Sequence, residues 1–457
     1  MVEGSRVGDA QKVPVTIRLK VPVTVRGAEV FALVQESWAD RLQIKFDRDY
    51  GAVPVRPPQR LLDEFRERGL QFLTVRALVD PRQIDAVRAQ QYVDRVFPDV
   101  PIEPFARLEP SGIALAAPGS SGRIECGTDK TVGTANQVAK DLGATRLWTA
   151  GYTGRGIVVG VVDGGITAHS RPAKFGGWPS IPQSPATGDV VGGWPPTDWG
   201  TVAEGWGQHG NMIAFDIQTI APEADLWDIR IYEPGVAFPG YLSNAEAAYQ
   251  FVIEHHRLHG VPQILVNAWG LYDSDNGPVY AFEPESDIAL HVEQALDDGI
   301  LIVWAAGNCG DGCPFPPGSP CGYHDRGPGG SILGPNGHPR VMTVGAATLH
   351  GQWCGYTSQG PAALPPHDPD KPDFCAISEF EGFFPNDSGL RSCDGGTSAA
   401  TGIAGGVVAL LKQARPDLSQ DECKRLLKET AHPIKTPAAH GGAGAGIIDA
   451  LRAFRAL

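Results

Sequence analysis

The sequence predicts an α/β fold with a mostly parallel sheet and helices on both faces, preceded by a small α+β domain. Residues 156–162 form an unbroken apolar, β-branched run, which is typical of a strand buried on both faces of a parallel sheet. Residues 13–21 alternate apolar and polar side chains, as a half-buried strand does. The length of 457 residues exceeds one average domain and therefore suggests two.

The N-terminal part alternates strands with helices. After a polar tail at 1–12, the pattern predicts strands at 13–21, 28–36, 70–78 and 92–97 and helices at 61–68 and 81–91. Ile84 and Val87 fall on one face of the last helix. This alternation predicts a small α+β domain of ferredoxin-like type over residues 13–108.

A linker separates this domain from the rest of the chain. Pro, Gly, Ala and Ser gather in EPSGIALAAPGSSG, and no helical or strand period is sustained there. We therefore expect a linker at 109–133 and a second domain at 134–457.

Four short motifs of the second domain carry chemistry. They surround Asp163, His209, Asn308 and Ser398 in that order, and read VVGVVDGGI, GQHGNMIA, IVWAAGN and DGGTSAATGIAGG. A serine hydroxyl is a poor nucleophile, so a serine hydrolase needs a nearby His and a carboxylate that fixes the tautomer of that His. Singly, an Asp after a strand or a His before Gly is more often a turn residue. All four together favour a catalytic triad.

These motifs resemble those of the subtilase family of serine proteases, over roughly residues 134–457. The resemblance implies a subtilisin-like fold in which Ser398 attacks the scissile carbonyl, His209 carries the proton and Asp163 orients His209. Asn308 matches the family's oxyanion donor, and the backbone N–H of Ser398, at the start of a predicted buried helix, is the second donor. No cofactor is implied for catalysis. Structural calcium is common in the family, but no oxygen-rich loop here is specific enough to name ligands.

Residues 264–270 (ILVNAWG) resemble the family's substrate-binding strand. Such an edge holds a peptide by main-chain hydrogen bonds, so Ala268, Trp269 and Gly270 are the predicted substrate-binding residues. The alternative is an ordinary core strand. Ala268 replaces the usual Ser, so we predict no preferred side chain. Met212, in place of a second His, and Gly402, in place of a Pro, remove no group that transfers protons.

Residues 73–105 resemble the second half of a subtilase propeptide. This implies that the N-terminal domain is an intramolecular inhibitor and that the chain cuts itself in the linker, after Phe105 and before Gly133. The alternative is an accessory domain of another function, because small α+β modules recur with many functions.

The predicted activity is that of a serine endopeptidase on peptide or protein substrates. A transpeptidase that resolves the same acyl-enzyme with an amine is one alternative. A binding protein that keeps the fold without activity is the other, although the intact triad speaks against it.

Charge and hydropathy exclude two classes of partner. The net charge is −14 and no long basic run is present, which argues against nucleic acid. No run approaches the roughly 18 apolar residues of a membrane helix. Residues 1–11 lack the apolar segment of a secretory signal, which favours the cytoplasm unless an export signal was removed, in which case the protein is secreted.

The presence of eight cysteines favours an oxidising compartment instead. Cys309, Cys313, Cys321 and His324 gather directly after Asn308. Their C-x₃-C-x₇-C-x₂-H spacing is not a standard zinc pattern, so a zinc site, a local disulfide and plain thiols remain alternatives, and no metal is predicted.

Overall fold

A computed structural model describes residues 12–105, 124–126, 131–167, 188–200, 206–232, 240–315, 317–385, 392–434 and 441–457. The predicted polar tail and most of the predicted linker lie outside these residues. The chain divides into two compact units, Met1–Val100 and Pro101–Leu457, which we call the N-terminal unit and the C-terminal unit.

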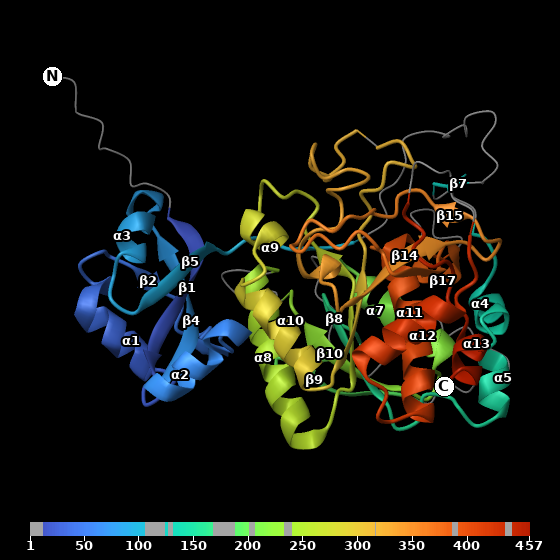
Figure 1. Ribbon diagram of the computed structural model, residues 1–457, viewed down its shortest axis with the longest axis horizontal. Helices are drawn as coiled ribbons and strands as arrows, with labels where there is room; N and C mark the ends of the chain where they lie inside the picture. The colour runs from blue at the N-terminus through green and yellow to red at the C-terminus, as the bar shows by residue number, and fades with distance from the viewer. Residues whose placement is uncertain are drawn as a thin grey trace. The chain divides into compact units, whose positions relative to one another are not determined.

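The N-terminal unit is an antiparallel sheet with short helices (Figure 1). Its central strands pair in the order β2-β4-β1-β5, and β3 also pairs with β4. The strands are β1 (Val13–Pro22), β2 (Lys45–Phe46), β3 (Ala52–Val55), β4 (Leu70–Val79) and β5 (Val93–Pro98). The helices are α1 (Glu29–Val34), a π-helical turn (Gln35–Ala39), α2 (Leu62–Arg68) and α3 (Ile84–Arg88), with 3-10 turns at Gln59–Leu61 and Pro81–Gln83. Alternate residues of β1, from Val15 to Val21, lie in its core.

One predicted strand of this unit is wrong. Residues 28–36 form helix α1 and part of the π-helical turn. Val30, Val34 and Trp38 are all buried, and their spacing of four is the spacing of one helix face. The apolar content was mistaken for a strand because the run is short. Strand β3, which pairs antiparallel with β4, was not predicted; it is only four residues long and contains Pro54, which weakens a strand pattern.

The C-terminal unit is built on a nine-stranded sheet in the part of the chain that is described. The strand order is β7-β15-β14-β13-β11-β8-β10-β9, with β16 also beside β14. All of the pairings are parallel except that of β14 with β15, which confirms the predicted mostly parallel sheet. The strands are β7 (Ile124–Glu125), β8 (Val158–Asp163), β9 (Val190–Trp194), β10 (Asp225–Arg230), β11 (Ile264–Asn267), β13 (Leu301–Ala305), β14 (Met342–Ala347), β15 (Trp353–Cys354) and β16 (Phe374–Ile377).

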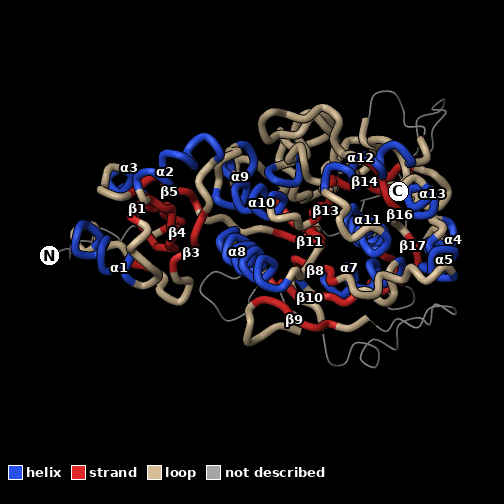
Figure 2. The backbone as a smooth tube through the Cα atoms, turned by 60° about the horizontal axis from the view of Figure 1, so that its bottom comes forward, coloured by secondary structure: helices blue, strands red, loops and turns tan. Residues whose placement is uncertain are grey.

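Helices cover both faces of this sheet (Figure 2). On one face, α7 (His209–Ile220) packs with α11 (Gly396–Ala414), and a Cβ at Gly405 of α11 would meet Val266 of β11 at 2.5 Å. On the other face, α8 (Leu242–His259) packs with α10 (Asp287–Asp297), and Phe251 of α8 stacks on Trp227 of β10. The predicted α/β architecture is confirmed.

Shorter elements complete the unit. They are α4 (Ala135–Asp141), α5 (Ala144–Thr149), α9 (Pro278–Phe282), α12 (Gln420–Thr430), α13 (Ala450–Arg455), the 3-10 turn Gly334–Gly337, and two small antiparallel pairs, β6 (Glu103–Pro104) with β12 (Trp269–Gly270) and β17 (Phe380–Pro385) with β18 (Ser392–Asp394). No described helix is long and apolar enough to cross a membrane.

Candidate active site

Asp163 and His209 form a buried pair. Strand β8 is apolar up to Asp163, its last residue, and His209 is the first residue of α7. His209 Nδ1 lies 2.8 Å from Asp163 Oδ2, while Asp163 Oδ1 accepts the N–H of Gly164 at 2.7 Å. The side chains of this pair are 1% and 3% exposed, so water does not compete for the carboxylate. This contact fixes the orientation of the imidazole ring.

Helices α7 and α11 run in the same direction, and this brings Ser398 level with His209. A Cβ at Gly402 would meet Ile213 and Asp216, and one at Gly406, a turn further on, would meet Ile217 and Ile220. One turn before Gly402 is Ser398, and one turn before Ile213 is His209. The Gly that replaces a Pro in the sequence motif thus lies where the two helices are in close contact.

Ser398 and Asn308 meet at the carbonyl group of Phe105. Ser398 Oγ donates to Phe105 O at 2.8 Å, and Asn308 Nδ2 donates to the same oxygen at 2.9 Å. Within the described residues, His209 Nε2 is buried without a hydrogen-bond partner. A ring nitrogen in this state is able to accept the proton of a neighbouring hydroxyl.

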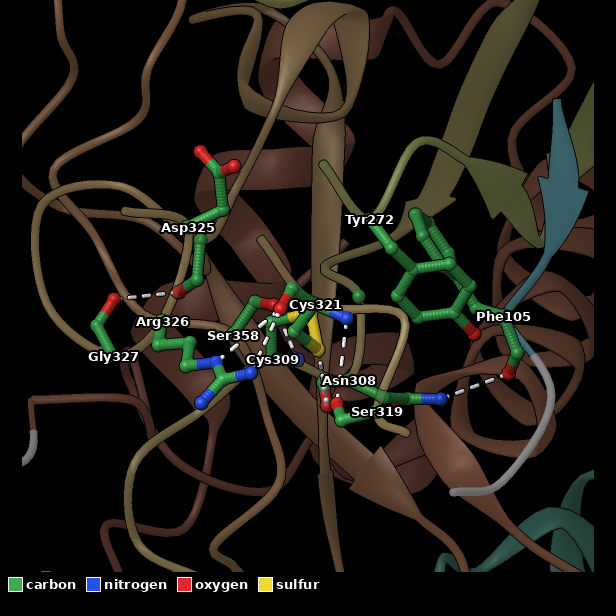
Figure 3. The surroundings of a disulfide bond; sticks show 12 residues. Phe105, Tyr272, Asn308, Cys309, Ser319, Cys321, Asp325, Arg326, Gly327 and Ser358 are labelled. Carbon is green, nitrogen blue, oxygen red and sulfur yellow. Dashed lines mark hydrogen bonds between the residues drawn. A yellow bond between two sulfur atoms is a disulfide. The ribbon is translucent and has the colours of Figure 1, made fainter. Parts of the chain in front are cut away.

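The amide of Asn308 is held in a defined orientation. Its Oδ1 accepts the N–H of Thr397 at 3.0 Å and the hydroxyl of Thr397 at 2.9 Å. The two acceptor contacts leave Nδ2 facing Phe105 O (Figure 3). Asn308 lies in the turn after β13, while Ser398 is in the first turn of α11, where the helix dipole favours negative charge.

The strand around Trp269 holds residues 101–105 as a peptide. Glu103–Pro104 pairs antiparallel with Trp269–Gly270, and the N–H of Phe105 donates to Ala268 O at 2.8 Å. On the other side, the N–H of Ile102 donates to Gly240 O at 2.8 Å. Tyr272 also donates its hydroxyl to Pro104 O, at 3.2 Å. This edge therefore binds main chain between two segments, as an extended peptide requires.

Comparison with models of known protein families identifies the family of this chain. The model of the subtilase family matches residues 154–446. The chain belongs to the subtilase family. The matched region contains Asp163, His209, Asn308 and Ser398, and it places this part of the chain among the subtilisin-like serine endopeptidases.

Known subtilases resemble the chain at low identity. M-protease of Shouchella clausii (strain KSM-K16) is 24% identical over 395 residues, which cover 84% of this chain and 81% of that protein. Bacillopeptidase F of Bacillus subtilis (strain 168) is 27% identical over 339 residues, but these span 69% of this chain and only 22% of that protein. The crystal structure of fervidolysin from Fervidobacterium pennivorans, titled a keratinolytic enzyme related to subtilisin, superposes with a TM-score of 0.59 at 18% identity, covering 99% of this chain and 62% of that one. The last likeness shows the fold alone.

The cysteines after Asn308 form disulfides, which overturns the zinc alternative. Cys309 bonds to Cys321, a local disulfide, and Cys313 bonds to the distant Cys126. A thiolate is needed to bind zinc, and a disulfide offers none. Across the described residues, no group of three or more His, Cys, Asp or Glu is placed to hold a metal ion.

Sequence reasoning missed three features of the site. Phe105 was predicted to end a propeptide-like segment but not to occupy the site, although the run Ile102-Glu-Pro-Phe shortly before the predicted linker was the available signal. Thr397 and the Cys126–Cys313 bond were also not foreseen.

Asp216, two turns after His209, lies fully buried. That burial, together with the nearby Asp394, raises the pKa of Asp216 well above the usual value and so favours its protonated form.

Proposed function

We propose that the chain is a serine endopeptidase with Ser398 as nucleophile, His209 as general base and acid, and Asp163 as the group that orients His209. The contact of Ser398 Oγ with the Phe105 carbonyl is the observation that carries the proposal, because a nucleophile must lie against the carbonyl that it attacks. The buried Asp163–His209 pair supports the assignment of the base.

The oxyanion is stabilised in this proposal by Asn308 and by the backbone N–H of Ser398. The Asn308 amide already donates to the carbonyl oxygen, on which negative charge develops as the tetrahedral intermediate forms. Ala268, Trp269 and Gly270 bind substrate main chain, because they hold residues 103–105 in that way.

The segment in the site is the chain's own, so the same machinery acts on it. We propose that the first cut is intramolecular and falls between Phe105 and Ala106, with Phe105 as the residue before the scissile bond. A tethered segment has a high effective concentration at the site. The fragment that ends at Phe105 then remains in the cleft as an inhibitor, in keeping with a propeptide.

Two disulfides bear on the compartment. Disulfides persist in oxidising environments and are rare in the reducing cytosol. Cys126–Cys313 and Cys309–Cys321 therefore favour the secreted alternative over the cytoplasmic one.

The test is Ser398→Ala beside wild type, with the exposed Ser37→Ala as the matched control. Wild type and the control should yield a new N-terminus at Ala106, hydrolyse casein and react with a fluorophosphonate. Ser398→Ala should stay uncut, inactive and unlabelled, because the nucleophile is missing. Intact mass and N-terminal sequencing report the cut. Cleavage of Ser398→Ala at the wild-type rate would refute the assignment.

A further inference from the structure

The ring of Phe105 fills a narrow pocket between two glycines. A Cβ at Gly270 would lie 2.5 Å from Phe105 Cζ, and one at Gly307 would lie 3.6 Å from the same atom. The ring is packed edge-on against Tyr272, with the centroids 5.3 Å apart, and the residue is only 3% exposed. The pocket therefore has two walls, which we call the strand wall (residues 268–272) and the oxyanion wall (residues 305–308).

The Cys309–Cys321 disulfide belongs to the same buried cluster as the Phe105 ring. Phe105 belongs to a small cluster of its own, whose other buried members are Tyr272, Ala305, Cys309 and Cys321. Figure 3 shows the disulfide beside Asn308, with the Phe105 carbonyl on the other side of that amide. Two of the cluster's five buried members are thus the bonded cysteines.

The disulfide also links the oxyanion wall to a segment that is hydrogen-bonded to the strand wall. Cys309 directly continues the oxyanion wall, and its N–H donates to Ser358 Oγ at 3.0 Å. Cys321 precedes Gly322, whose N–H donates to Tyr272 O of the strand wall at 2.9 Å. Without the S–S bond, the covalent path from Cys309 to Cys321 runs through the Pro- and Gly-rich residues 310–320.

Other contacts hold the two ends in place separately. Gly310 and Gly312 donate their N–H groups to Tyr356 O and Gly355 O, which fixes the Cys309 end. Arg326 donates to Cys321 O at 3.0 Å, which holds the other end. Loss of the disulfide should therefore allow the distance between the two walls to vary, while these other contacts keep the fold intact.

We propose that the Cys309–Cys321 disulfide is the specificity-determining element of this pocket, because it sets the separation of the two walls at the width of an aromatic ring. The inference rests on the proposed function and assigns to this one cross-link the discrimination between an aromatic and a small residue before the scissile bond. A change in one buried apolar contact alters discrimination by roughly 10- to 200-fold.

The experiment compares two variants that each lose one disulfide. Cys309→Ala/Cys321→Ala removes the link at the pocket, and Cys126→Ala/Cys313→Ala is the matched control, because Cys313 lies between the two cysteines of the first bond. Each processed enzyme is assayed on the anilides of Ile-Glu-Pro-Phe and Ile-Glu-Pro-Ala, which copy residues 102–105. The ratio of kcat/KM for Phe over Ala should fall at least about tenfold in the first variant and change less than about twofold in the control.

A double-mutant cycle within the chain gives an independent readout. Phe105→Ala should slow self-cleavage by about tenfold or more with the disulfide present, and by less than about threefold in Cys309→Ala/Cys321→Ala. This comparison uses the uncut chain, so it needs no added substrate.

A third variant separates the cross-link from the apolar lining. Cys309→Val/Cys321→Ala keeps apolar volume without a bond. If this variant is folded by circular dichroism and retains the wild-type ratio, lining alone sets specificity and the proposal is overturned. An unchanged ratio in Cys309→Ala/Cys321→Ala overturns it as well. Failure of the proposed function looks different, because wild type would then hydrolyse neither anilide and would not react with a fluorophosphonate.

Discussion

Replacing Phe105 by alanine should slow the proposed self-cleavage without changing the catalytic groups. The Phe105 ring is 3% exposed between Gly270 and Gly307, so the substitution removes a nearly fully buried aromatic side chain. Burying such a side chain contributes about 1.5–3 kcal/mol, and about 1.4 kcal/mol corresponds to a factor of ten. The docked fraction of residues 101–105, and with it the rate, should fall by roughly 10- to 150-fold.

The main-chain contacts of this segment survive the substitution. The N–H of residue 105 still donates to Ala268 O, and Glu103–Pro104 still pairs with Trp269–Gly270. The bond that is cut should therefore stay the same while the rate falls. Phe105→Leu, which keeps most of the apolar surface, should lie between Phe105→Ala and wild type.

The assay is a time course of intact mass after rapid dilution of the unfolded chain into native buffer. The rate should be first order and independent of protein concentration, because the segment is tethered beside the site. Phe46→Ala is the matched control, since Phe46 packs against the core of the N-terminal unit and lies far along the chain from the cleft segment. A wild-type rate in Phe105→Ala, or an equal slowing in Phe46→Ala, would refute a pocket for the ring.

Two further substitutions test catalysis and stability. Asn308→Ala should lower kcat about 10²–10³-fold and leave KM nearly unchanged, since the contact of Asn308 with the carbonyl oxygen strengthens as negative charge develops there. Steady-state kinetics on an anilide measure both constants, and a rise in KM alone would contradict this prediction. Asp373→Asn should destabilise the fold by about 3–5 kcal/mol, because Lys371, buried at 1% exposure and 2.9 Å from Asp373, loses its counter-charge. Denaturant unfolding in a Ser398→Ala background measures the loss, and the exposed Asp370→Asn should be near neutral.

The Lys371–Asp373 ion pair also determines the direction in which stability changes with pH. Although burial opposes ionisation of Asp373, Lys371 and Lys424 lower its pKa overall. Asp373 therefore contributes stability above its unfolded pKa of about 3.9, and that stability is lost as the pH falls through the lower folded value.

The proposed catalytic groups could be placed in the fold from the sequence because each stands at a position that local sequence defines. Asp163 ends a wholly apolar strand, and Ser398 begins a helix of small and apolar residues. A buried parallel strand and a buried helix are recognisable from composition alone, and the carboxyl edge of the sheet is where sites form.

Other features depend on tertiary contacts that no local pattern records. Residues 28–36 carry apolar side chains compatible with a strand or a helix, and packing of Val30, Val34 and Trp38 decides for the helix. The bond of Cys126 to Cys313 joins residues 187 positions apart, and cysteine spacing does not fix connectivity. The occupation of the cleft by Phe105 likewise requires the three-dimensional course of the chain.

The positions of the proposed cut and of the disulfides determine which fragment is free to dissociate after cleavage. All eight cysteines follow Phe105, so a cut after Phe105 leaves the N-terminal fragment with no covalent link, whereas Cys126–Cys313 keeps the new N-terminal segment on the C-terminal unit. Breaking the bond after Phe105 removes none of the contacts made by residues 102–105: the main-chain hydrogen bonds and the buried ring all lie before the cut. The fragment is therefore still held after cleavage by the contacts that held it before. In the proposed mechanism, activity on other substrates is limited by dissociation or degradation of this fragment, and the cut itself is only the first step of activation.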